Sequence, residues 1–122
     1  MAADPVTLRF AATTERVRLA RSLVATLADS AGFDYDDVED LRIAVDELCF
    51  LVLDSMPATA ELELVARSEP GDIDVEGTLH GADGARPAEP SEISTQILST
   101  VVDTYELNLE GTPRFRFRKS KS

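Results

Sequence analysis

Hydrophobic and polar residues follow two periods along this chain, and each period predicts a different kind of element. Residues 7–10 alternate with a period of two, which predicts a short strand with Leu8 and Phe10 on one face. Over residues 15–29 the apolar positions recur at the spacing of one face of an amphipathic helix. Gly32 follows this stretch, and we expect it to cap the C-terminus of the helix.

A longer helix is predicted over residues 36–55, and its apolar positions lie on two opposite faces. Asp36 is the expected N-cap, and Glu39 is its expected partner in a capping box. One apolar face of the helical wheel consists of Val38, Leu41, Val45, Leu48 and Val52. The opposite face consists of Ile43, Ala44, Phe50 and Leu51, with Glu47 in its middle. We therefore predict a helix that is sandwiched between two layers of structure.

Glu47 is the candidate functional residue of this helix, because it is a carboxylate in a predicted apolar setting. Burying such a charge is costly unless a partner compensates it. One interpretation is a general base or a substrate-binding acid. The alternative is structural: an internal ion pair with Arg9 or Arg67, or a face that is wet because it borders a cleft. The sequence leaves both interpretations open.

The second half of the chain predicts two hairpins separated by a helix. Apolar and polar residues alternate over residues 60–68, a turn is predicted at Pro70-Gly71, and Ile73 and Val75 belong to the returning strand. Residues 80–90 are expected to form a loop. A helix is predicted over residues 91–103, with these residues turned inward: Ile93, Ile97, Leu98, Val101 and Val102. Residues 105–109 and 114–118 form the second predicted hairpin. Its last strand places arginines on one face and phenylalanines on the other: Arg114, Arg116 and Arg118 against Phe115 and Phe117.

The predicted order of elements is β-α-α-β-β-α-β-β. Its economical packing is a two-layer α/β (α+β) sandwich, with the helices on one face of a mixed, mainly antiparallel sheet. A chain of 122 residues fits a single domain over residues 1–122. Cys49 lies in an apolar helical run, and we expect it to be a buried, reduced core residue.

Charge and hydropathy narrow the classes of partner. The net charge is −11, from 23 acidic and 12 basic side chains, which argues against direct binding to nucleic acid, because phosphate contacts need a clustered positive field. The same charge is compatible with a basic protein partner, or it serves solubility alone. No apolar run approaches the length of a membrane span, and the N-terminus lacks the features of a signal peptide. We therefore expect a cytoplasmic protein without a membrane contact.

One segment of the chain carries a family resemblance. Residues 33–53 read FDYDDVEDLRIAVDELCFLVL and resemble the segment written loosely as LRLAVxEAxxNA in the bacterial anti-sigma serine kinases. These belong to the GHKL superfamily of histidine-kinase-like ATPases. The order of elements and the closing Gly111-Thr112 before a final strand are also similar to that family. The resemblance implies that Glu47 occupies the place of the general base, and that Thr112, with Gly111 and Gly81, lies at the ATP pocket.

The sequence also departs from the family pattern at the positions that bind nucleotide. Leu51 stands where the family has the asparagine that holds Mg²⁺, and a leucine cannot ligate a hard cation. The family's DxGxG aspartate takes the adenine amino group, and Gly77 stands at that position; Asp83-Gly84 is a later, poorer candidate. Two prolines, Pro87 and Pro90, interrupt the stretch that replaces the glycine-rich phosphate lid. We therefore expect no bound metal and no cofactor, with ATP and Mg²⁺ as the less favoured outcome.

The resemblance implies a degenerate member that works by binding. The protein would sequester a sigma factor of the general-stress or sporulation type. A STAS-fold anti-anti-sigma protein would compete with the sigma factor for this protein. The protein would also pair as a homodimer. Exposed arginines of the first helix are the candidate sigma-binding residues: Arg16, Arg18 and Arg21. Two alternatives remain: an active ATP-dependent serine kinase that uses Glu47 on an anti-anti-sigma protein, and an interaction module unrelated to transcription.

Overall fold

The computed structural model describes residues 4–53, 59–81 and 89–121, and its elements follow the predicted order. They are β1 (Val6–Ala11), a 3₁₀ turn (Thr14–Arg16), α1 (Val17–Ser30), α2 (Tyr35–Leu53), β2 (Glu61–Glu69), β3 (Asp72–His80), α3 (Glu92–Val101), β4 (Thr104–Asn108) and β5 (Arg114–Ser120). The predicted loop over residues 80–90 begins one residue too early, because His80 is the last residue of β3. Among the described residues, no helix is both long and apolar enough to cross a membrane.

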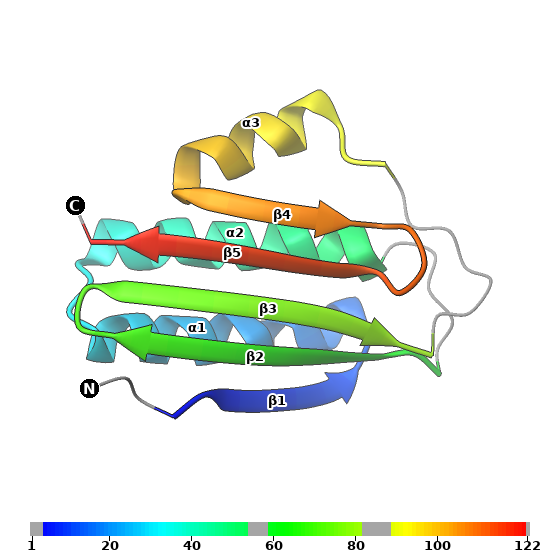
Figure 1. Cartoon of the computed structure of the whole chain (residues 1–122), viewed down its shortest axis with the longest axis horizontal. Coiled ribbons are helices and arrows are strands. Elements are labelled where there is room, and N and C mark those ends of the chain that lie inside the picture. The colour runs from blue at the N-terminus through cyan, green and yellow to red at the C-terminus, as the bar shows by residue number, and fades with distance from the viewer. Residues whose placement is uncertain (1–3, 54–58, 82–88, 122) are drawn as a thin grey trace.

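The five strands form one sheet in the order β1-β2-β3-β5-β4, and every neighbouring pair is antiparallel. Figure 1 shows α1 and α2 against one face of this sheet, with α3 beside the β4 edge and no helix drawn on the other face. The predicted two-layer α+β fold is therefore confirmed. The described sheet contains no parallel pair, so it is antiparallel rather than mixed.

The core lies between the sheet and the helices. Alternate residues of each strand point to the helices, because side chains of a strand alternate between the two faces. The largest fully buried side chains include Leu62 and Leu64 of β2, Ile73 of β3 and Phe117 of β5. Cys49 is also fully buried in α2, as predicted. The opposite faces of the strands carry the charged residues.

Helix α1 ends at Ser30, and Gly32 caps its C-terminus as predicted. This glycine has a φ of +89°, the left-handed conformation that glycine adopts without a steric cost. The backbone N–H of Phe33 donates to the carbonyl of Ala28 at 3.1 Å, and that of Gly32 to the carbonyl of Asp29 at 3.1 Å. These two bonds form a Schellman motif, which satisfies carbonyls at the helix end and turns the chain toward α2.

The N-cap of α2 was predicted wrongly. The side chain of Asp34, not Asp36, caps the helix, because its Oδ1 accepts a hydrogen bond from the backbone N–H of Asp37 at 2.9 Å. The carboxylate of Glu39 accepts from Arg42 at 3.0 Å, so it forms no capping box. Asp37 is turned into the protein, where Lys119 of β5 lies 3.7 Å away. The last predicted residues of this helix, 54 and 55, lie outside the described residues.

Helix α2 is not sandwiched between two layers. Ile43 is 43% exposed and Phe50 is 48% exposed, so the second apolar face of the predicted wheel is open to solvent in part. The first turn of α3 contacts Glu47, and Ala44 and Leu51 of that face are buried, whereas Ile43 and Phe50 stay partly open to solvent. The helices form a single layer on the sheet. The same reason explains Ile93 of α3, which was expected inward and is 69% exposed, whereas Leu98 is buried as predicted.

Lys119 joins three elements at one end of the sheet. Its ammonium group donates to the carbonyl of Val101 at 3.0 Å and lies 3.6 Å from Asp40 and 3.7 Å from Asp37. The side chain of Lys119 is only 10% exposed. A buried ammonium group needs such partners, because its charge is otherwise poorly compensated. The contacts bind the end of β5 to the start of α2 and the end of α3.

Candidate functional site

Glu47 makes its polar contact with α3. The hydroxyl of Ser94 donates to Oε1 of Glu47 at 2.7 Å, and the hydroxyl of Ser91 donates to Ser94 Oγ at 3.1 Å. Ser91 also caps α3, because its Oγ accepts from the backbone N–H of Ser94 at 3.0 Å. Glu47 is half-buried and Ser94 is buried. The carboxylate therefore joins the middle of α2 to the first turn of α3.

Neither arginine proposed as a structural partner of Glu47 is in contact with it. Arg9 pairs with Glu61, at 3.2 Å, on an exposed part of β1 and β2. Arg67 is exposed on β2, and its neighbours in the strand, Ala66 and Ser68, have the opposite orientation. Sequence reasoning missed Ser94, because a hydroxyl that lies far along the chain leaves no local signal.

The position four residues after Glu47 offers no metal ligand. Leu51 is 8% exposed and packs in the core. Over residues 4–53, 59–81 and 89–121 there is no group of three or more His, Cys, Asp and Glu side chains that could hold a metal ion. The residues present at this place therefore do not suit Mg²⁺, which prefers oxygen ligands.

Gly77 lies directly under an aromatic ring. It pairs in register with Phe115 on β5, and a Cβ atom added to Gly77 would lie 2.5 Å from Cε2 of that ring. Phe115 is itself 3% exposed. The ring of Phe115 thus occupies the space where a larger side chain at residue 77 would project. An acid that recognises adenine cannot be accommodated here without displacement of Phe115.

The other residues assigned to a nucleotide pocket lie at one end of the sheet. Gly81 follows β3 with a φ of +78°, and Gly111 lies between β4 and β5 with a φ of +66°. The backbone N–H of Leu79 donates to the carbonyl of Pro113 at 2.9 Å, which holds the two turns together. Thr112 is exposed, whereas Pro113 is the buried residue. Among the described residues, no polar contact joins Glu47 to these positions.

The arginines assigned to partner binding lie on α1 and the turn before it. Arg16 and Arg18 are exposed, and Arg21 lies 3.3 Å from Asp46 of α2. A groove of about 390 Å³ between α1 and α2 is lined by Arg18, Arg21, Ser22, Glu39, Arg42, Ile43 and Asp46. The structure thus brings two of the three predicted arginines into one groove. Sequence reasoning missed the α2 side of it, although Glu39, Arg42 and Asp46 recur at helical spacing.

One feature gives this α1–α2 groove the character of a protein-binding surface. Ile43 is exposed beside the charged residues, which provides apolar surface. Oδ1 of Asp46 has no hydrogen-bond donor among the described residues, but this atom is buried and is not presented to a partner. A groove with arginines and an exposed isoleucine suits a protein partner.

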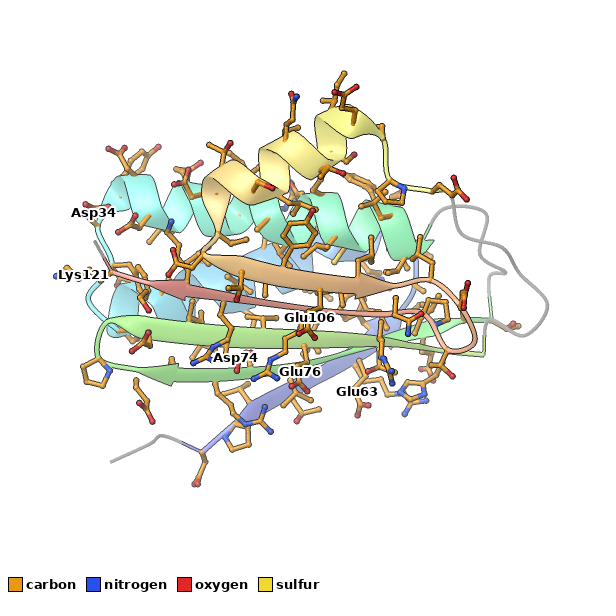
Figure 2. The ribbon with its side chains drawn as sticks, turned by 45° about the horizontal axis from the view of Figure 1, so that its top comes forward. Asp34, Glu63, Asp74, Glu76, Glu106 and Lys121 are labelled. Atoms are coloured by element: carbon orange, nitrogen blue, oxygen red, sulfur yellow. The ribbon has the colours of Figure 1, made fainter. Side chains whose placement is uncertain are left out.

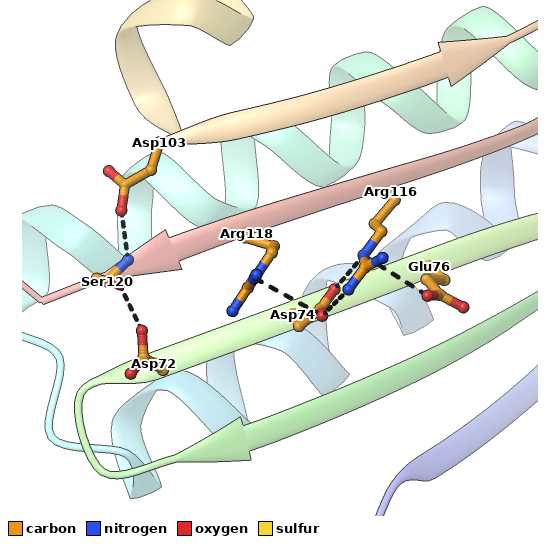
Figure 3. Close-up of polar contacts among 7 residues, drawn as sticks. All are labelled: Asp72, Asp74, Glu76, Asp103, Arg116, Arg118 and Ser120. Carbon is orange, nitrogen blue, oxygen red and sulfur yellow. Dashed lines mark hydrogen bonds and ion pairs between the residues drawn. The ribbon is translucent and has the colours of Figure 1, made fainter.

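On the open face of the sheet, acidic and basic side chains of neighbouring strands form ion pairs. Figure 3 shows Arg116 of β5 donating to Asp74 of β3, through Nε at 3.1 Å and Nη2 at 2.7 Å. This hydrogen bond and the charge of Asp74 raise the pKa of Arg116. Arg118 lies 3.8 Å from the same carboxylate. In Figure 2 the labelled acids Glu63, Asp74, Glu76 and Glu106 lie along this face. The predicted arginine stripe exists, and acids of β3 partly neutralise it.

Comparison with known proteins shows relatives of one kind. The chain is 31% identical over 106 residues to the anti-sigma-F factor RsbW of Mycobacterium tuberculosis, an alignment that covers 87% of this chain and 62% of that protein. It is 42% identical over 48 residues to the serine-protein kinase RsbW of Bacillus licheniformis, which covers 39% of this chain and 30% of that protein. The chain therefore spans about three fifths of the length of the mycobacterial relative. No protein-family model matches the chain.

A solved structure shows the same fold. The crystal structure of the RsbU and RsbW domains of a Mycobacterium tuberculosis protein matches with a TM-score of 0.71, covering 97% of this chain and 32% of the other, at 14% sequence identity. At this identity the match shows the fold alone.

Proposed function

We propose that this chain is an RsbW-like anti-sigma regulator that binds and sequesters a sigma factor without transferring phosphate, which its similarity to RsbW proteins supports. The observation that carries the proposal is the α1–α2 groove, which gathers Arg18 and Arg21 beside exposed Ile43. Arginine is among the residues that contribute most at protein interfaces. Arg16, exposed just before α1, extends the same surface.

The site around Glu47 supports binding rather than catalysis. A general base must be free to accept a proton from the attacking group. Here the carboxylate accepts a hydrogen bond from Ser94 of the same chain, Leu51 stands at the metal position, and the Phe115 ring covers Gly77. We therefore assign Glu47, Gly81, Gly111 and Thr112 to the remnant of an ATP pocket.

The proposal has further parts that follow from the same family. A STAS-fold anti-anti-sigma protein competes for the regulator, and release of the sigma factor depends on competing affinities. The chain folds as one domain over residues 1–122, pairs as a homodimer, and acts in the cytoplasm, where sigma factors bind RNA polymerase. It makes no direct contact with nucleic acid or membrane.

Co-purification from the native host tests the partner class. We expect the tagged protein to capture a sigma factor, identified by mass spectrometry. Arg18 is exposed and has no ion pair among the described residues, so Arg18→Glu reverses one charge of the groove without breaking an internal contact. We expect this variant to weaken capture by about tenfold. Arg67→Glu makes the same charge change on the open sheet face and should leave capture unchanged. Recovery of no sigma factor, or an equal loss in both variants, contradicts the proposal.

The second candidate function is an ATP-dependent serine kinase, which the names of the Bacillus relatives favour. Calorimetry with Mg-ATP separates it from the first. We expect no binding in the micromolar range. Micromolar binding that Glu47→Ala abolishes would replace the binding proposal with the kinase.

A further inference from the structure

A second groove lies at the other end of the helical layer, between α3 and the edge strand β4. It measures about 730 Å³, and its apolar floor consists of Leu98 of α3 with Tyr105, Leu107 and Leu109 of the β4 segment. Glu89 and Glu110 stand at its rim. None of these residues lines the α1–α2 groove, so the two surfaces are separate.

The floor of this groove is incompletely covered because of its place in the fold. Helices α1 and α2 pack on the strands β2, β3 and β5, whereas β4 at the edge of the sheet is packed by α3. Tyr105, Leu107 and Leu109 point toward the helical layer but remain partly exposed beside the core. Figure 1 shows the short helix α3 running alongside β4. Apolar residues thus remain accessible between the helix and the strand.

The charged residues that line this groove are both acidic. They are Glu89 and Glu110, and both are exposed. Glu92, in the first turn of α3, is also exposed. This differs from the α1–α2 groove and from the open sheet face, where arginines and acids alternate. A partner that approaches α3 and β4 therefore experiences a negative field at an apolar groove.

We propose that the α3–β4 groove is a docking site for a basic segment of a partner protein. The occupant is a short peptide stretch that places two or three large apolar side chains on Leu98, Tyr105 and Leu107 and sets Lys or Arg against Glu89 and Glu110. Apolar anchors in a groove supply affinity, and charges at the rim supply specificity and a faster association. The inference does not depend on the sigma-factor proposal, because it uses only residues of α3, of β4 and of the segments that flank them.

A synthetic peptide tests this inference with the whole chain. The probe is a fluorescein-labelled 16-residue peptide in which leucines recur at helical spacing and the remaining positions are lysine and serine. Two matched peptides replace lysine by glutamate or leucine by serine. Anisotropy measures affinity at low and physiological salt, and NMR spectra of the ¹⁵N-labelled protein locate the contact. We expect only the Leu/Lys peptide to bind, with shifts confined to α3 and β4.

Charge reversal at the rim supplies the decisive variant. Both glutamates are exposed, so E89K/E110K should keep the fold, which circular dichroism checks. We expect it to weaken binding by about tenfold or more. The exposed Glu15 and Glu69 lie outside the groove, and E15K/E69K, which makes the same change in net charge, is the matched control that should bind as wild type does. Binding that E89K/E110K leaves unchanged, NMR shifts elsewhere, or no binding at millimolar peptide overturns the proposal. Self-association that E89K/E110K abolishes, without peptide binding, would assign the groove to a second copy and also overturn it.

Discussion

Substitution of Gly77 by alanine tests the close contact between β3 and the ring of Phe115. The added Cβ would lie 2.5 Å from Cε2 of the ring, whereas carbon atoms in contact are normally about 3.5–4.0 Å apart. The ring or the strand must therefore move by about 1 Å. Phe115 is 3% exposed, so the ring cannot turn into solvent without the loss of its burial.

The expected cost follows from two opposing terms. Overpacking a core costs about 1–3 kcal/mol. Gly77 is not among the glycines with a positive φ, so alanine gains about 0.5–1 kcal/mol by replacing a flexible glycine within a strand. We predict that Gly77→Ala lowers the free energy of unfolding by about 1–2 kcal/mol. An aspartate at the same position should cost more, because it also buries a carboxylate.

Denaturation in urea, followed by circular dichroism, measures this change. The control is Gly77→Ala in a Phe115→Leu background, where the smaller side chain leaves room for the added methyl group. The two substitutions should couple by about 1–3 kcal/mol, with alanine neutral or stabilising in that background. Thr78→Ala, on the open face of the sheet, controls for the change in strand propensity. A Gly77→Ala protein at least as stable as wild type, or additive effects of the two substitutions, would refute the contact.

Three further predictions concern buried groups. Burial raises the pKa of the Cys49 thiol above its usual 9.0. The thiol should therefore resist thiol reagents until the protein unfolds. The free energy of unfolding should fall above about pH 9, where the thiol ionises in the unfolded chain only. Lys119→Met should cost about 3 kcal/mol in urea denaturation, because the substitution leaves the buried carboxylate of Asp37 uncompensated, and it should cost less in an Asp37→Asn background; equal costs in both backgrounds contradict this. Ser94→Ala should cost about 1–3 kcal/mol in urea denaturation through the bond to Glu47, and less once Glu47→Ala has removed the acceptor; equal costs in both backgrounds would contradict this.

The order of elements could be predicted because local patterns determine it. The period-two runs, the Pro70-Gly71 turn and the Gly32 cap each act over a few residues. The choice of N-cap could not be predicted in the same way, since Asp34 and Asp36 are equivalent locally. Helix α2 begins at Tyr35, and its residue Asp37 faces Lys119, which lies far along the chain. A local pattern does not report this tertiary contact.

The surroundings of Glu47 were predicted only in part. The helical wheel placed Glu47 among apolar residues of α2, and several of them are buried. It could not show whether another layer covers Ile43 and Phe50, because a wheel records which residues share a face and not what packs against them. The hydroxyl of Ser94 and the ring of Phe115 reach the site through α3 and the β3–β5 register. Both contacts depend on the tertiary fold, so no local pattern reports them.

Titration of the captured sigma factor into this protein, with and without Mg-ATP, tests the central claim most directly. The account predicts saturable binding with the same affinity in both conditions, unchanged by Glu47→Gln and weakened by Arg18→Glu. Absence of binding, or binding that requires Mg-ATP and is lost with Glu47→Gln, would contradict it.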